Sequence, residues 1–162
     1  MKKILFLAVM AVLLVACGNE NGESKATFTE KNAVPFLIAD YDEKIAPIYM
    51  NQVPYMAYAE TEPQFELLKK RFQLDEGLQM DMNKSIALFI VSQSNSCGIV
   101  PDGVYNVDGK LSVQLMEPTG DKCEPEPLDH TFVLEVPKAD YEKVQLYNGN
   151  VIKSSVDIKP VE

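Results

Sequence analysis

The residues best able to do chemistry in this chain are its three cysteines and its single histidine. Cys123 and His130 are separated by six residues, a spacing that zinc fingers do not use, and adding Cys97 would give three ligands without an identifiable fourth. A redox-active thiol pair usually forms a CXXC motif, whereas Cys97 and Cys123 lie 26 positions apart in the chain. We therefore expect no metal and no other cofactor, and we rank thiol-disulfide catalysis last among the functions considered.

The segment SQSNSCG offers three hydroxyl groups, at Ser92, Ser94 and Ser96. One of them could act as a nucleophile that His130 activates. However, neither a nucleophile elbow nor an oxyanion motif surrounds these serines. We expect instead a polar segment at the end of a strand, with hydroxyl groups bonded to turn amides, and we assign no catalytic residue in this chain.

The remaining cysteine, Cys17, follows an apolar run near the start of the chain. The chain opens with MKK, and the 13 residues from 4 to 16 carry no charge. As a helix this run would extend about 20 Å, which is shorter than the ~30 Å hydrocarbon core of a membrane, so it fits a signal peptide. Its ending, LVAC, resembles the lipobox of bacterial lipoproteins, and Gly18 is typical of the following position. An uncleaved anchor or a plain secretory signal is the alternative.

We therefore predict that residues 1–16 are a lipoprotein signal peptide and that Cys17 carries the lipid. Cys97 and Cys123 then remain as an even pair in an exported domain, for which a disulfide is the default expectation. The loop between them contains the Asp108-Gly109 dipeptide, so the bond would join either two strands or two loops. In the chain-entropy description, closing this loop contributes roughly 3–4 kcal/mol to stability.

The charge of the chain excludes some classes of partner. The full chain has 15 basic and 24 acidic residues and a net charge of −9; loss of Lys2 and Lys3 with the signal leaves 13 basic residues and a net charge of −11. Such an acidic protein is unsuited to nucleic acid or anionic lipid, because both require basic patches. The acidic segments 40–43 and 81–83 resemble fragments of calcium loops but lack the twelve-residue pattern. We interpret them as solvated loop charge.

The mature chain reads as one domain on a tether. Residues 17–33 comprise the lipidated cysteine and the polar segment GNENGESKATFTEKN, a composition typical of a flexible linker. Neither an internal repeat nor a second linker divides the remainder. Removal of 16 of the 162 residues leaves 146, about the size of one domain. We predict a single globular domain over residues 34–162, beginning near Val34.

The clearest helix of this domain begins at Thr61. Thr61 and Gln64 have capping-box spacing, Pro63 lies in the first turn, and Gly77 is well placed to end the helix. The apolar residues repeat with helical spacing at Phe65, Leu68 and Phe72.

Short apolar segments predict strands elsewhere. Residues 86–91 form an unbroken apolar run, which is typical of a strand covered on both faces. Asp108-Gly109 and Asn148-Gly149 predict hairpins, and Pro54 places the segment 53–59 at a sheet edge. The other candidate strands are residues 34–39, 104–107, 111–115, 131–136, 144–147 and 151–158. The expected fold is α+β, with a mostly antiparallel sheet of five to seven strands and one main helix packed on it.

The order of these features resembles the C-terminal domain of the protease-complex subunit PrcB. The resemblance covers about residues 58–138 and comprises a helix, a buried strand running into SQSNSCGI, a hairpin, a second cysteine and HTFVLEVPK. Ser96, Cys97, Gly98 and Pro137-Lys138 resemble recurring positions of that family. The resemblance implies a compact β-rich module without known catalytic residues. The parent subunit is associated with stabilising a protease complex as a non-catalytic partner, a role that a short lipoprotein with this domain alone need not share.

Together these observations predict a non-enzymatic protein that the Cys17 lipid anchors on the extracytoplasmic face of the cell membrane. We expect it to bind or stabilise another envelope protein and not to bind nucleic acid. A receptor for a small molecule or a cation, using the acidic loops, is the alternative. No feature of the sequence assigns the binding surface.

Overall fold

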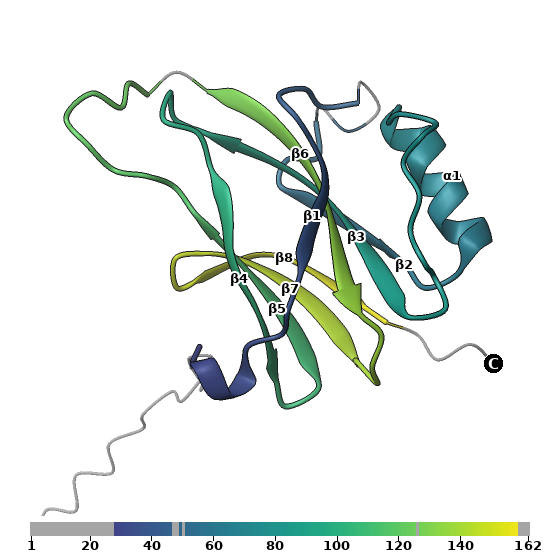
Figure 1. Cartoon of the computed structure of the whole chain (residues 1–162). Helices are drawn as coiled ribbons and strands as arrows, with labels where there is room; N and C mark the ends of the chain where they lie inside the picture. The colour runs from purple at the N-terminus through teal and green to yellow at the C-terminus, as the bar shows by residue number, and fades with distance from the viewer. Residues whose placement is uncertain (1–27, 47–48, 50, 126, 159–162) are drawn as a thin grey trace, which may run out of the picture.

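The computed structural model describes residues 28–46, 49, 51–125 and 127–158, which form eight strands in two four-stranded sheets and one α-helix (Figure 1). The predicted signal peptide, Cys17 and the segment up to residue 27 lie outside these residues. The first sheet has the order β1-β6-β3-β2 and the second β4-β5-β7-β8. The bounds are η1 (Glu30–Asn32, a 3-10 helix), β1 (Leu37–Asp42), β2 (Tyr55–Ala59), α1 (Glu62–Phe72), β3 (Ser85–Ser94), β4 (Val100–Val107), β5 (Lys110–Met116), β6 (Leu128–Pro137), β7 (Lys143–Asn148) and β8 (Val151–Asp157).

The α+β class and the predominance of antiparallel pairs are confirmed, since only β5 and β7 pair in parallel. The expectation of five to seven strands in one sheet is wrong. The β4–β5 hairpin does not extend the sheet that contains β3; instead, β6 returns to pair with β3 over all ten residues of each strand. Alternating apolar residues predict a buried face but do not state which element covers it, so the division into two sheets was not visible in the sequence.

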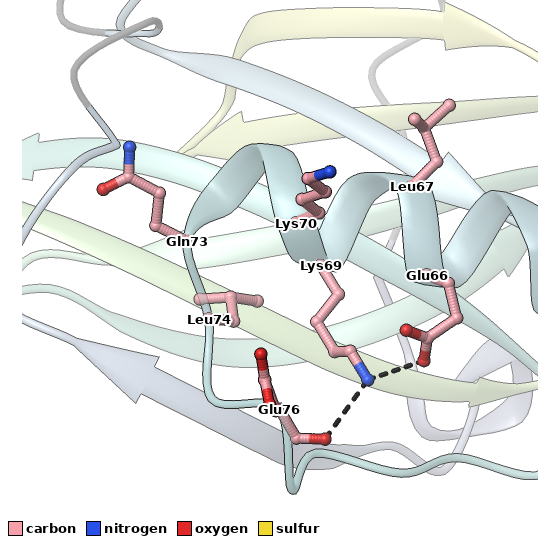
Figure 2. A pocket seen from close by; sticks show the side chains of 7 residues that line it. All are labelled: Glu66, Leu67, Lys69, Lys70, Gln73, Leu74 and Glu76. Atoms are coloured by element: carbon pink, nitrogen blue, oxygen red, sulfur yellow. Dashed lines mark hydrogen bonds and ion pairs between the residues drawn. The ribbon is translucent and has the colours of Figure 1, made fainter.

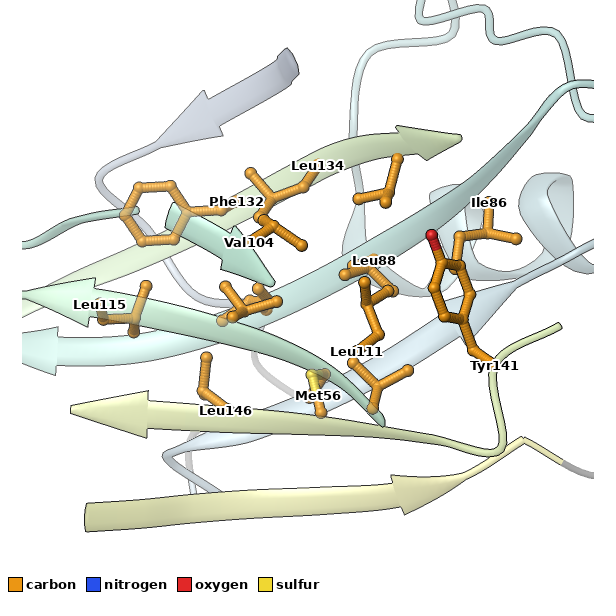
Figure 3. Packing of buried hydrophobic residues seen from close by; sticks show 14 of the residues in the cluster. Met56, Ile86, Leu88, Val104, Leu111, Leu115, Phe132, Leu134, Tyr141 and Leu146 are labelled. Carbon is orange, nitrogen blue, oxygen red and sulfur yellow. The ribbon is translucent and has the colours of Figure 1, made fainter. Parts of the chain in front are cut away.

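The main core lies between the two sheets (Figure 3). Apolar side chains of β3 and β6 meet those of β4, β5 and β7, as Leu88, Leu134, Val104 and Leu111 illustrate in Figure 3. A second core lies between the first sheet and α1, where Phe65, Leu68 and Phe72 pack on it. On β3, residues 86, 88 and 90 face the main core while residues 87, 89 and 91 face the second. The prediction of a central strand buried on both faces is therefore confirmed.

The predicted hairpins and helix are confirmed, except that the C-terminal end of the helix lies earlier than expected. Asp108 (φ 51°) and Gly109 (φ 77°) both have the positive φ of a type I′ turn between β4 and β5. Helix α1 follows Thr61 as expected but ends at Phe72 rather than at Gly77. Gln73 adopts the left-handed conformation (φ 57°) and ends the helix, a role for which glycine is merely the commonest residue.

Within the described residues, the chain is already packed on the domain at Phe28, ahead of the start expected near Val34. The ring of Phe28 lies 4.8 Å from that of Tyr105 on β4 and 5.1 Å from that of Tyr147 on β7, centroid to centroid. The N–H of Val34 then donates to the carbonyl oxygen of Val104 (2.8 Å). The polar composition around Phe28 concealed this contact. Within the part of the chain that the structure covers, no helix combines the length and the apolar character needed to cross a membrane.

Candidate functional site

A cleft of about 430 Å³ opens at one end of the sandwich, between β1, β6 and the start of β4. Its size lies within the usual range of ligand sites, about 300–1,000 Å³. Four large apolar side chains on its walls are exposed: Ile38 (50%), Tyr41 (45%), Val100 (45%) and Leu128 (38%). The other residues that line the cleft are Glu43, Ser96, Cys97, Gly98, Ile99, Pro101, His130 and Phe132. We refer to this site below as the cleft.

A β-bulge in β1 directs two of these side chains into the cleft. Ile38 is paired with Leu134 and Tyr41 with Phe132, although Ile38 and Tyr41 are three positions apart and their partners only two. Side chains alternate between the two faces of a regular strand, so Ile38 and Tyr41 would otherwise point in opposite directions. The extra residue, Ala39, restores the alternation, and both side chains face the second sheet.

The interior face of the first sheet changes from apolar to polar where it reaches the cleft. Along β6, Phe132, His130 and Leu128 lie two positions apart and therefore share one face of the strand. On β3, Ser92 lies opposite His130 and Ser94 lies opposite Leu128. The same face of β3 carries apolar side chains nearer the start of the strand. The main core therefore ends in a small polar group beneath the cleft.

His130 is at the centre of this polar group and is only 1% exposed. Its Nδ1 lies 3.0 Å from the hydroxyl oxygen of Tyr41, and its Nε2 lies 2.7 Å from Oγ of Ser94. The hydroxyl of Ser94 also lies 2.9 Å from the carbonyl oxygen of Asn95, which can only accept. Either neutral tautomer of the imidazole can pair with both hydroxyl groups; in the one where Nε2–H donates to Ser94 and Tyr41 O–H donates to Nδ1, the Ser94 proton is free to bond Asn95. A neutral imidazole satisfies every group in this chain of bonds.

The electrostatic surroundings favour the same protonation states. Burial lowers the pKa of His130 and outweighs the opposing influence of Glu43 and Asp129. Burial raises the pKa of Tyr41, and the nearby carboxylates of Glu43 and Asp42 raise it further. Both rings are consequently neutral near pH 7.

The structure brings together Ser94 and His130, one of the pairs considered from the sequence as nucleophile and base. A nucleophilic serine must donate its proton to the imidazole and must also be open to a substrate. Ser94 is buried and is not among the residues that line the cleft. Ser96 accepts a 2.7 Å hydrogen bond from the N–H of Glu124, which is the role in binding loop amides expected for these hydroxyl groups.

The predicted disulfide between Cys97 and Cys123 is present, with Cα atoms 5.2 Å apart. It joins the β3–β4 loop to the β5–β6 loop, so of the two geometries expected it is the bond between loops. Cys97 lines the cleft, and the N–H of Ser96 donates to the carbonyl oxygen of Glu124 (3.0 Å) beside the disulfide. The disulfide therefore fixes one wall of the cleft to a second loop.

The prediction of solvated loop charge is confirmed for residues 81–83, which lie in a turn with Asp81 exposed, and is wrong for much of the segment 40–43. Asp40 and Asp42 belong to strand β1, because an edge strand can carry charge on its solvated side. Asp81 accepts from the N–H of Asn83 and forms an ion pair with Lys84 (2.9 Å). Within the described ranges, no group of three or more His, Cys, Asp or Glu side chains is arranged to hold a metal ion.

A larger hollow of about 800 Å³ lies beside the C-terminal half of α1 (Figure 2). Its one buried ammonium, that of Lys69, is already bound: it lies 2.6 Å from Oε1 of Glu66 and 3.4 Å from the carbonyl oxygen of Glu76, as the dashed lines show. A third bond, of 3.3 Å, reaches the carbonyl oxygen of Leu78. Lys69 thus holds the segment after α1 against the helix, and the cleft is the better candidate for a binding site.

Sequence reasoning did not identify the cleft. Ile38 and Tyr41 come from β1, Leu128 from β6 and Val100 from β4, so they share no motif. Comparison with protein-family models, with curated proteins and with solved structures found no match. The resemblance to the PrcB domain therefore stays a prediction.

Proposed function

We propose that the protein is a lipid-anchored, extracytoplasmic and non-enzymatic interaction module, and that the cleft is its binding site. The observation that carries this proposal is the convergence of four exposed apolar side chains from three strands on one concave site. Singly exposed apolar residues need no explanation, but a concave group of them marks an interaction site.

The rigidity of the walls supports a role in binding. The bulge sets the positions of Ile38 and Tyr41, the disulfide holds the loop at Cys97, and the hydrogen bonds of His130 fix the floor. A preformed site loses little entropy when its partner binds. The burial of Ser94, which is not among the residues that line the cleft, favours a structural role for this polar group over a catalytic one, in agreement with a non-enzymatic module.

Site-specific photo-cross-linking in intact cells tests the proposal. A photoreactive residue in place of Ile38 should give a reproducible adduct with one envelope protein. Val151 supplies a matched control, because it is also an exposed apolar residue on an edge strand (56% exposed) but lies on β8 and does not line the cleft. Absence of an adduct at Ile38, or identical adducts at both positions, would contradict the proposal.

Thermal-shift measurements with a panel of small ligands distinguish the interaction module from the alternative, a small-molecule receptor. A ligand that binds only the native state stabilises it by RT ln(1 + L/Kd), where L is the free ligand concentration, so the Tm rises with the logarithm of that concentration once it exceeds Kd. If small apolar ligands raise the Tm of the protein, and Ile38→Ser abolishes the shift, the cleft is a small-molecule site and the interaction proposal is wrong.

A further inference from the structure

The charge on the walls of the cleft is of one sign. Glu43 lines the cleft directly. Asp42 and Asp129 are neighbours in sequence of Tyr41 and His130, so alternation turns their side chains to the other face of the first sheet, where they line a neighbouring hollow. Among the twelve lining residues there is no Lys or Arg. Three ion pairs occur within the described residues, and none of them includes Glu43.

Lys44 is the basic residue nearest in sequence to Glu43, but it lines the neighbouring hollow with Asp42 and Asp129 and does not line the cleft. The cleft therefore combines apolar walls with the carboxylate of Glu43, and an occupant should carry both an apolar group and positive charge.

We propose that the cleft binds an extended peptide segment in which a bulky apolar side chain is flanked by Lys or Arg. The inference rests on the function proposed above and adds the chemistry of the partner. The apolar side chain enters between Ile38, Val100 and Leu128, and the basic side chain pairs with Glu43 at the rim.

Recognition depends on side chains more than on addition of a strand to β1. The N–H of Tyr41 is already bonded to Oδ1 of its neighbour Asp40 (2.9 Å), which closes this point of the edge to a peptide backbone. The same carboxylates disfavour a second copy of this chain, because paired β1 edges would bring Asp40 and Asp42 close to like charges. Anionic lipid and nucleic acid are disfavoured for the same electrostatic reason.

Selection from a phage-displayed library of random 12-residue peptides tests the proposal with the full-length protein in detergent. The enriched peptides should share a bulky apolar residue with Lys or Arg within two positions. Ile38→Ser should weaken their binding about tenfold through lost apolar contact. Glu43→Lys should weaken it about fivefold or more, as expected for reversal of an exposed charge.

Two variants serve as matched controls. Asp140→Lys makes the same charge reversal in the exposed β6–β7 connection, ten residues beyond His130, and Val151→Ser removes an apolar side chain from β8. Both should change the Kd by less than twofold. Added salt should weaken binding to the wild type more than binding to Glu43→Lys.

The outcomes distinguish failure of this inference from failure of the proposed function. Enriched peptides without basic residues, or peptides equally sensitive to Asp140→Lys, would overturn the assigned chemistry while an adduct at Ile38 in cells still supported an interaction module. Absence of any enriched peptide would also overturn the inference. Loss of the cellular adduct with retained selection of basic peptides would contradict the proposed function alone.

Discussion

At the scale of single residues, burial explains the polar group beneath the cleft better than the identity of its side chains. Ser94, His130 and Tyr41 form a hydrogen-bonded row that resembles a catalytic arrangement in composition and distance. Ser94 is nevertheless buried and does not line the cleft. The row therefore closes the open end of an apolar core with satisfied polar groups, which a buried end requires.

The neutral state of His130 predicts how stability depends on pH. Burial lowers its pKa in the folded state below the ordinary 6.5, so the unfolded chain binds the proton first as the pH falls. The free energy of unfolding should therefore decrease as the pH falls below about 6.5, and level off below the folded-state pKa. Urea unfolding at pH 7.5 and pH 5.5 measures this decrease.

His130→Gln is the variant that isolates this effect, because His130 is the single histidine of the chain. The variant should be less stable at pH 7.5, since it loses bonds to Ser94 and Tyr41, but its stability should change less between the two pH values. If the wild type gained stability relative to the variant on acidification, Glu43 and Asp129 would outweigh burial and the neutral assignment would be wrong.

At the scale of elements, local sequence rules succeeded where one short segment determines the conformation. The Asp108-Gly109 turn, the start of α1 and the doubly buried β3 each depend on neighbouring residues, and each was predictable. The bulge at Ala39 and the partners of β6 depend on pairing between segments distant in the chain. The disulfide also joins distant segments, but it was predictable because only two cysteines remained to pair. The cleft was not predictable, because its residues come from several strands and share no motif.

The turn at Gly109 gives a direct test of this local determination. Gly109 has φ 77°, where an added Cβ is strained whatever space surrounds it. Gly109→Ala should therefore lower the free energy of unfolding by about 1–2 kcal/mol. Gly120→Ala is the control, since a Cβ there meets Sγ of Cys123 at an ordinary 3.8 Å without a positive φ. Equal losses in urea unfolding of both variants would show that φ is not the cause.

At the scale of the whole molecule, the described start of the chain and the cleft lie at opposite ends of β4. Phe28 packs on Tyr105 near the end of β4, while Val100 lines the cleft at its beginning. In Figure 1, η1 lies at the far end of the second sheet from the loops that join β3 to β4 and β5 to β6. Eleven peptide units separate Cys17 from Phe28 and can span at most about 40 Å. An anchor at Cys17 would thus keep Phe28 within about 40 Å of the membrane and attach the domain at the end of β4 opposite the cleft.

Substitution of Cys17 tests both the anchor and its consequence for binding. Cys17→Ser should leave an unprocessed or released protein, because lipid attachment requires the thiol; cell fractionation and labelling with an alkyne fatty acid measure the loss. The double variant Cys97→Ser/Cys123→Ser is the control and should stay labelled in the membrane fraction. Normal membrane retention of Cys17→Ser would contradict the lipoprotein assignment. Because neither described core includes Cys17, the purified variant should bind selected peptides with unchanged Kd. In cells it should nevertheless lose the adduct at Ile38, because a released domain is no longer concentrated beside a membrane-bound partner.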